Sequence, residues 1–328
     1  MQDVKEDGPP GLPFPPFVRK PPDEVSYHVM VRKINTSEKL RTTLPLGDTD
    51  ACRLVDGAGD DLPGIFLDDF AGHRLLSTTA PTLSPELEDW ANSLAPSITT
   101  YWKHLDQQAR EAPSLVAGTK LTKPFEIHEI GIRYLASFQS GYSQGIFLDQ
   151  RENRIRVRDR CQAGDTVLNT FAYTGTFSVC AALSGATTTT LDLSQPYLDW
   201  ARENMLLNRI DALAHHFCRG DTFHWLRRFA RQDRRFSGIV LDPPTFSRDH
   251  RGKVFRAEEH YGELVALAAA CLAPRGWLLC TTNCRRLPDH GFRRMVAEAL
   301  PSHVRLESHP MPPDFTDDPY LKTLLVET

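Results

Sequence analysis

From Gly164 onward, short apolar segments alternate with amphipathic segments, and this pattern constrains the fold more than any other feature of the chain. Short apolar runs predict strands, and apolar residues spaced three and four apart predict helices. The expected strands are Thr166–Thr170, Thr188–Leu191, His216–Arg219, Gly238–Leu241, Trp277–Thr281, Arg305–His309 and Leu321–Val326. The expected helices are Phe177–Leu183, Gln195–Asn208, Phe223–Arg231, Glu258–Leu272 and His290–Leu300. Strands that alternate with helices form a mainly parallel sheet. The sequence therefore predicts an α/β domain with a Rossmann-like, seven-stranded sheet over residues 141–328.

The chain ahead of this domain has two parts of different composition. Residues 1–48 contain many prolines and predict an arm that is largely irregular. Residues 49–140 predict a small α+β domain. Within it, Arg53–Val55 and Ile65–Leu67 predict short strands. Ser84–Leu94 predicts a helix, with a serine N-cap and a proline at the first helical position.

The overall composition indicates a soluble, intracellular protein. The hydrophobic fraction is 41% and the charged fraction 24%, and no apolar run reaches the roughly 20 residues that cross a bilayer. The acidic N-terminus does not fit a signal peptide, and the seven cysteines include no Cys-x-x-Cys pair. We therefore expect a cytoplasmic protein with reduced thiols, no membrane partner and no metal site. The sequence leaves a homodimer open.

The net charge of −4 argues mildly against broad, salt-driven binding of nucleic acid. Arginines nevertheless cluster in three places, within residues 151–160, 227–235 and 285–294. Such clusters are more often solvated helix faces than phosphate contacts. They matter for function only where they flank a reaction centre.

The loop between the first predicted strand and its helix, Asn169–Phe177, lies where ligands bind in open α/β sheets. A dinucleotide fingerprint would place three glycines here, so that the backbone can approach a pyrophosphate. This loop has one, Gly175. It suits a cofactor without phosphates, such as S-adenosylmethionine, although a lone glycine can also serve turn geometry alone.

Two carboxylates follow the next predicted strands. Asp192 ends the second strand, in the position of an acidic residue that binds ribose hydroxyls. Asp221 follows the third strand, where it can accept a hydrogen bond from an adenine amine. Both could instead be acids at helix N-termini. Their placement at successive strand ends, next to the glycine loop, favours the cofactor site.

Asp242-Pro243-Pro244 follows the fourth predicted strand. Prolines cannot donate to a sheet, so the pair stops the strand and fixes a rigid, extended loop. Its carbonyls can then accept hydrogen bonds from a base, on which Phe246 can stack. An Asp-Pro turn that only ends the strand is the alternative. The shared edge with the cofactor loop favours a functional role.

Residues 139–326 resemble the bacterial 23S ribosomal RNA large-subunit methyltransferases, whose members make 5-methylcytosine or 7-methylguanine. Residues 52–70 look like the central domain of that family, which makes residues 49–140 a domain of the RNA-recognition type. The matching segments are Gly145–Arg151, Asn169–Gly175, Asp192–Ser194, Ala201–Asn204, Asn208, Asp242–Phe246 and Tyr320–Lys322.

The resemblance implies a class I methyltransferase fold, S-adenosylmethionine as cofactor and 23S ribosomal RNA as partner. It also implies that Asp149 lies near the cofactor and that Asp242 lies at the transfer site. The cofactor-binding residues it implies are Gln150, Arg151, Phe171, Tyr173, Thr174, Gly175, Asp192, Ser194, Asn208, Asp221 and Asp242. Members of the family often carry an N-terminal PUA domain, for which the residues ahead of 50 are too few and too rich in proline.

The catalytic set consists of Asp242, Pro243 and Pro244, with Cys284 as a further candidate nucleophile. Methylation of cytosine C5 needs such a nucleophile. The catalytic cysteine of the family's cytosine branch, however, would align with Asn283 and not with Cys284. A shift of one residue along a strand would point the Cys284 thiol to the opposite face, away from the site. Guanine N7 is already nucleophilic, so alignment alone can suffice. Thr282-Asn283 resembles the Ser-Asn-Asn run of the guanine-N7 branch, so we favour guanine N7 over cytosine C5 and interpret Cys284 as a buried structural residue.

Two other classes of function remain open from the sequence alone. The acidic balance and the missing PUA domain would also suit a methyltransferase of a small molecule or a protein. A cofactor-binding scaffold that assists ribosome assembly without catalysis is the other alternative.

Overall fold

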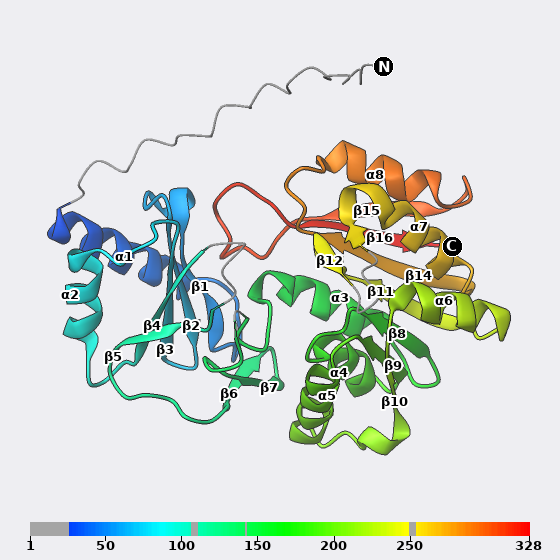
Figure 1. The fold of residues 1–328 in the computed structure, drawn as a ribbon, viewed down its shortest axis with the longest axis horizontal. Coiled ribbons are helices and arrows are strands. Elements are labelled where there is room, and N and C mark those ends of the chain that lie inside the picture. Colours follow the sequence, from blue (N-terminus) through cyan, green and yellow to red (C-terminus); the bar gives the residue numbers. More distant parts are fainter. Residues whose placement is uncertain (1–25, 106–110, 142, 249–253) are drawn as a thin grey trace, which may run out of the picture.

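The computed structural model describes residues 26–105, 111–141, 143–248 and 254–328. Two sheets stand side by side in Figure 1, each with its own helices, and a short hairpin lies between them. No helix in these ranges is long and apolar enough to cross a membrane.

The C-terminal sheet has seven strands in the order β10-β9-β8-β11-β14-β16-β15. Their bounds are β8 Thr166–Thr170, β9 Thr187–Asp192, β10 His216–Arg219, β11 Phe236–Leu241, β14 Leu272–Thr282, β15 Arg305–His309 and β16 Lys322–Glu327. The five strands β8, β9, β10, β11 and β14 run parallel to one another. Strand β16 runs antiparallel to both of its neighbours, β14 and β15. The predicted seven-stranded α/β sheet is confirmed.

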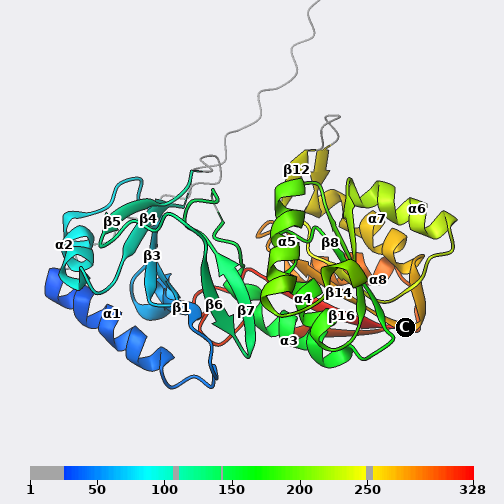
Figure 2. The same ribbon diagram turned by 90° about the horizontal axis from the view of Figure 1, so that it is seen from below.

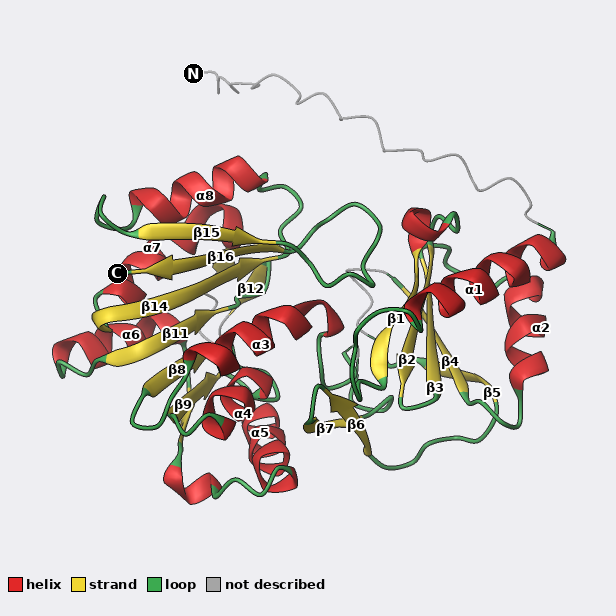
Figure 3. Ribbon diagram, turned by 180° about the vertical axis from the view of Figure 1, so that it is seen from behind, coloured by secondary structure: helices red, strands yellow, loops and turns green. Residues whose placement is uncertain are grey.

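Helices cover both faces of this sheet (Figures 1 and 3). On one face lie α3 Arg151–Arg160, α4 Thr176–Leu183 and α5 Gln195–Leu207. On the other face lie α6 Thr222–Arg231, α7 Ala257–Ala269 and α8 Asp289–Glu298. Apolar side chains of α6, α7 and α8 form one core with β11 and β14, and those of α3 and α4 form another. Five of these six helices follow the predicted bounds closely; α3 was not predicted.

Helix α3 corrects the interpretation of the first arginine cluster as a solvated helix face. Its sequence has no apolar stripe, because arginines and acids occupy most positions. Two of its arginines are nevertheless fully buried, with Arg151 bonded to Asp314 and Arg154 to Glu129. Ion pairs, which hydrophobic periodicity does not reveal, therefore anchor this helix.

The N-terminal sheet has the strand order β1-β2-β3-β4-β5. Its strands are β1 Ala51–Asp56, β2 Ile65–Phe70, β3 His73–Thr78, β4 Thr100–His104 and β5 Ser114–Ala117. Helices α1 Tyr27–Arg41 and α2 Pro85–Leu94 share an apolar core with it, and the short helix η1 Gly57–Asp60 links β1 to β2. The predicted cap of α2 is present, since the Ser84 hydroxyl accepts from the Leu87 amide.

Helix α1 contradicts the prediction that residues 1–48 are largely irregular. Met30 and Ile34 lie one turn apart and are buried against β1 and α2. These two are the buried apolar side chains of the helix, so its amphipathic signal is weak. The proline-rich part of the predicted arm, residues 1–25, lies outside the described residues.

Two segments join the sheets. The hairpin of β6 Phe125–Glu129 and β7 Ile132–Ala136 contributes to a core that includes residues of β1 and β3 as well as of α4 and α5. The loop of residues 310–321, between β15 and β16, reaches across to the N-terminal sheet (Figures 1 and 3). At its centre, buried Asp314 accepts the Arg53 backbone N–H at 2.9 Å and binds the Arg151 guanidinium. The two sheets are therefore tied together beside the start of α3.

Candidate active site

The chain reverses its direction across the sheet between β8 and β11. From β8 it proceeds to β9 and β10 on one side, and then to β11 and β14 on the other. Ligands in open α/β sheets bind beyond the carboxyl ends of the strands at such a switch point. The loop after β8 and the Asp-Pro-Pro loop after β11 border it from the two sides.

The loop after β8 has an unusual backbone. Phe171 and Tyr173 have φ angles of 51° and 50°, in the left-handed region that side chains with a Cβ rarely adopt. Gly175 has a φ of 72°, and a Cβ there would lie 2.6 Å from the Ala201 Cβ. Strained residues of this kind cluster at binding sites, where the surroundings hold them in place. At Gly175 the missing Cβ allows α5 to pack closely, and the strained backbone of Phe171 and Tyr173 marks this loop as a candidate binding site.

Asp192, at the end of β9, holds the strained loop. Its carboxylate accepts the Tyr173 N–H at 2.9 Å and the Ser194 N–H at 2.8 Å. Burial raises the pKa of this carboxyl, while these backbone hydrogen bonds lower it. Each carboxylate oxygen can accept a further hydrogen bond. Asp192 therefore keeps acceptor capacity for a bound hydroxyl.

Asp221 lies at the N-terminus of α6, after β10. Its side chain caps the helix by accepting the His224 N–H at 2.8 Å. The alternative interpretation of Asp221 as a helix cap is thus correct, and the spare lone pairs of the carboxylate leave a second role open.

Asp242 follows β11 and joins a network of polar side chains. Its Oδ1 accepts from Gln150 Nε2 at 2.9 Å and from Thr281 Oγ1 at 2.5 Å. Asn153 in turn donates to Gln150 Oε1 at 2.6 Å, and Gln150 is buried in the short helix η2 Leu148–Gln150. Burial raises the pKa of Asp242 to about 6, against the lowering effect of the Thr281 hydrogen bond, and the nearby Asp149 raises it further.

The Asp-Pro-Pro loop leaves the sheet as the sequence predicts. Strand β11 ends at Leu241, Pro243 is buried and Pro244 is exposed. The chain then enters a small hairpin of β12 Phe246–Arg248 and β13 Val254–Arg256, which projects from the sheet in Figure 2. Phe246 keeps 43% of its surface exposed, and the Arg256 guanidinium carbon lies 6.0 Å from the centre of its ring.

Two residues predicted to bind the cofactor have other roles. The Arg151 side chain is fully buried, and both terminal nitrogens donate to Asp314. Asn208 caps the C-terminus of α5, about 20 Å along the helix axis from Ser194 at the other end. Its amide bonds to the backbone of Arg133 in β7. Arg151 and Asn208 therefore hold elements of the protein together, and we propose this structural role for them in place of cofactor binding.

The segment before α3 is bound to the cofactor loop by contacts that the sequence did not reveal. Thr174 is buried and donates to the Gly145 carbonyl at 2.6 Å, and the Tyr173 hydroxyl accepts the Gly145 N–H at 2.9 Å. Asn204 of α5 donates to the Thr174 carbonyl at 2.9 Å and accepts from the Leu135 N–H at 2.9 Å. Asn204 belongs to the segment Ala201–Asn204, which resembles the methyltransferase family. That resemblance is the sequence feature that could have pointed to its role.

Cys284 lies in the apolar core, two residues after the end of β14. Its exposed fraction is 0%, and its Sγ is 3.6 Å from Glu258 Oε2. The neighbouring Asn283 is exposed and accepts from the Thr245 hydroxyl of the Asp-Pro-Pro loop at 2.8 Å. Asn283, and not Cys284, therefore faces the loop that carries Asp242.

Within the described ranges, no group of three or more histidine, cysteine or acidic side chains could hold a metal ion.

Two features together define a class I methyltransferase fold. One is the strand order, in which β16 is reversed and lies beside the edge strand β15. The other is the pair of loops at the switch point.

Comparisons with known proteins agree with this class. The family model described as S-adenosylmethionine-dependent methyltransferase matches residues 76–327. Ribosomal RNA large subunit methyltransferase I of Aeromonas salmonicida is 32% identical, over 84% of this chain and 74% of that protein. The same-named protein of Erwinia tasmaniensis is 30% identical, over 92% of this chain and 80% of its own. SMU.776, solved in complex with SAH, has a TM-score of 0.84 and 25% identity, and the match covers 94% of this chain and 83% of SMU.776.

The chain therefore belongs to the S-adenosylmethionine-dependent methyltransferases, within the family of the ribosomal RNA large-subunit methyltransferases. It is an enzyme whose cofactor is S-adenosylmethionine.

Proposed function

We propose that this enzyme methylates a base of 23S ribosomal RNA, at N7 of a guanine. The observation that carries the proposal is Asp242, a carboxylate fixed by Gln150 and Thr281 on the switch-point edge that also bears the cofactor loop. The names of the relatives in Aeromonas salmonicida and Erwinia tasmaniensis support ribosomal RNA as the substrate.

The residues at the switch point fit S-adenosylmethionine. Asp192 would accept hydrogen bonds from the ribose hydroxyls, and Asp221 from the adenine amine. The strained backbone of Phe171, Tyr173 and Gly175 would let the cofactor approach closely, with Thr174 bonded to Gly145. The Ser194 N–H would help to hold the Asp192 carboxylate in place. When bound, S-adenosylmethionine supplies an electrophilic methyl group.

Asp242 would hold the target base. Guanine presents N1–H and N2–H donors on the edge opposite N7. Because Gln150 and Thr281 already use Oδ1 of Asp242, the two lone pairs of Oδ2 would accept them. Methylation at N7 leaves a positive charge on the purine, which an ionised Asp242 stabilises in a site partly shielded from water. Gln150 and Thr281 would act as positioning residues, because they fix the carboxylate from the side of the protein.

The environment of Cys284 supports guanine N7 over cytosine C5. A C5 methyltransferase needs a thiolate that attacks the pyrimidine ring. The Cys284 thiol has no exposed surface and donates to the Glu258 carboxylate, within a core of apolar side chains from α7, α8 and β14. The exposed Asn283 occupies the neighbouring position at the site. Direct transfer to N7 requires no nucleophile from the protein.

The experiment supplies unmodified 23S ribosomal RNA transcript and S-adenosylmethionine with a labelled methyl group. We expect label in the RNA, and 7-methylguanosine after digestion to nucleosides. Label recovered as 5-methylcytidine would overturn the choice of base. Absence of label in RNA, with transfer to a protein or a small molecule in a cell extract, would overturn the RNA substrate. Cofactor binding without transfer to either would indicate a non-catalytic scaffold.

A further inference from the structure

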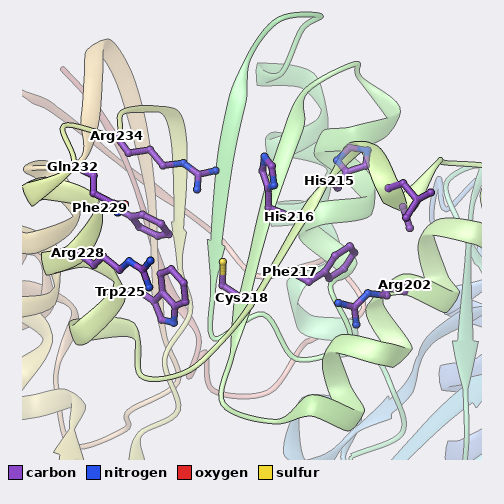
Figure 4. A pocket seen from close by; sticks show the side chains of 12 residues that line it. Arg202, His215, His216, Phe217, Cys218, Trp225, Arg228, Phe229, Gln232 and Arg234 are labelled. Atoms are coloured by element: carbon purple, nitrogen blue, oxygen red, sulfur yellow. The ribbon is translucent and has the colours of Figure 1, made fainter.

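A groove runs along β10, away from the site described above. Strand β10 is at the edge of the seven-stranded sheet, and within the described part of the chain it pairs with β9 alone. The groove has a volume of about 440 Å³ and lies between α6 on one side and α5 with the short helix η3 Ala212–Ala214 on the other. Figure 4 shows that the guanidinium groups of Arg228 and Arg234 are directed toward the strand that carries His216 and Cys218.

The arginines of this groove lie over aromatic rings. The distances from guanidinium carbon to ring centre are 4.2 Å for Arg202 over Phe217, 4.8 Å for Arg228 over Trp225, 5.0 Å for Arg234 over Phe229 and 5.1 Å for Arg234 over Phe236. Stacking on a ring fixes the plane of a guanidinium and leaves its N–H edge free to donate. Arg202 pairs with Asp199 at 2.7 Å, so Arg228 and Arg234 are the groove's preorganised donors without a carboxylate partner among the described residues.

In the part of the chain that the structure describes, Arg228 and Arg234 differ from the arginines next to them in the sequence in having no carboxylate partner. Arg227 and Arg235 point elsewhere, and each pairs with a carboxylate, Glu263 and Asp233 respectively. Among the described residues, neither Arg228 nor Arg234 has a carboxylate within 4.0 Å. The side-chain hydrogen bond of Arg234 goes to the Thr189 hydroxyl, at 2.7 Å. In a chain with a net charge of −4, unpaired arginines that converge on one groove indicate an anionic ligand.

His215 adds a neutral donor to the same groove. Its Nδ1 accepts the Thr188 backbone N–H at 3.1 Å, so the proton of the neutral ring is on Nε2. Burial lowers the pKa of His215, and the neighbouring His216 lowers it further, which keeps the ring neutral at pH 7. The groove thus combines cationic, neutral and aromatic groups, which suits phosphates linked to bases better than a single inorganic anion.

We propose that this groove binds a single-stranded stretch of the RNA substrate that flanks the target base, with Arg228 and Arg234 on its phosphates. The inference rests on the proposed RNA substrate. Strand β10 is three places from β11 in the sheet, or about 14 Å at the spacing of neighbouring strands. Neighbouring nucleotides, and not the target base itself, would therefore occupy the groove while Asp242 holds the base.

A second copy of the chain suits the groove less well than RNA. A two-fold symmetric contact across β10 would set the same arginines of both copies against each other. Like charges placed opposite one another oppose such a contact.

The test is the double variant Arg228→Gln/Arg234→Gln, compared with Arg275→Gln/Arg294→Gln. The control removes the same charge from two exposed arginines outside the groove, on β14 and α8. Affinity for unmodified 23S RNA transcript is measured over a range of salt concentrations, together with S-adenosylmethionine affinity and sedimentation. For the groove variant we expect RNA binding weakened by about tenfold or more, and a salt slope lower by about two. Cofactor affinity should stay at the parent value, and the control should bind RNA nearly as the parent does.

Three outcomes would overturn the inference. One is a groove variant that binds RNA with the parental affinity and slope, and another is an equal loss in the control. The third is a parent that sediments as a dimer while the groove variant is a monomer, which would make a second copy the occupant. A parent that neither binds nor methylates the transcript would instead contradict the proposed function, and with it this groove's ligand.

Discussion

Replacing Asp314 with asparagine removes the negative charge opposite Arg151 while it nearly preserves the shape of the side chain. Both side chains of this pair have an exposed fraction of 0%. Asp314 also accepts the Arg53 backbone N–H, so the variant acts where residues 310–321 meet both α3 and the N-terminal sheet. The charge of Arg151 would then stay buried without its partner.

Loss of one partner from a buried ion pair costs about 3–5 kcal/mol, because the remaining charge has lost its counter-charge and cannot reach water. We therefore expect Asp314→Asn to lower the free energy of unfolding by about that amount. The double variant Arg151→Met/Asp314→Leu removes both charges and should recover most of the loss. It still leaves the Arg53 N–H without an acceptor, a residual cost of about 1–3 kcal/mol.

Denaturation by guanidinium chloride, followed by tryptophan fluorescence, measures the stability of the parent and both variants. Calorimetric titration with S-adenosylmethionine measures their cofactor affinity. The double variant should bind cofactor like the parent, because Arg151 is bonded to Asp314 and not directed to the site. A stable double variant that has lost cofactor binding would refute this assignment and return Arg151 to the cofactor. An unchanged stability of Asp314→Asn would refute the reasoning on the ion pair.

Three further predictions concern the active site. Asp192→Ala should weaken S-adenosylmethionine binding by about ten- to a hundredfold in calorimetry, because the ribose hydroxyls lose a charged acceptor. Cys284→Ser should retain most methyl transfer, and the parent should form no adduct with RNA that contains 5-fluorocytosine, since the thiol is buried. The kcat/KM of the parent should rise with pH and level off above the raised pKa of Asp242, about 6, because the ionised carboxylate holds the base. Asp242→Asn should lose most activity and this pH dependence.

Each of these three predictions has a result that would contradict it in a protein that is still folded. Unchanged cofactor affinity in a folded Asp192→Ala protein would remove Asp192 from the site. An adduct that survives a denaturing gel would make Cys284 a nucleophile and shift the enzyme to the 5-methylcytosine branch. Because burial raises the pKa of Asp242, its ionisation in the folded state costs stability that grows as the pH passes from about 4 to about 6. Asp242→Asn should therefore be at least as stable as the parent at pH 7, and a clear loss of stability there would contradict the raised pKa of Asp242.

The sequence by itself determined the parts of the protein that depend on short stretches of chain. Strands β8 and β10 begin and end at the predicted residues, because a run of apolar residues and the turn that closes it are both local. The positions of the loop around Gly175 and of the Asp-Pro-Pro loop at the switch point also follow from the order of strands and helices. The chemistry of each loop was therefore predictable before the fold was known.

Only the tertiary structure decided how buried polar groups are paired. Arg151 stands beside Gln150 in a polar segment, but its partner Asp314 is 163 residues away, and no local pattern connects them. Helix α3 is consequently held by ion pairs that hydrophobic periodicity cannot reveal. The arginines at positions 227, 228, 234 and 235 look alike in sequence, yet two pair with carboxylates and two face the groove along β10. The physical reason is that burial and charge pairing depend on which distant segments the fold brings together, whereas strands, turns and helix caps depend on neighbours along the chain.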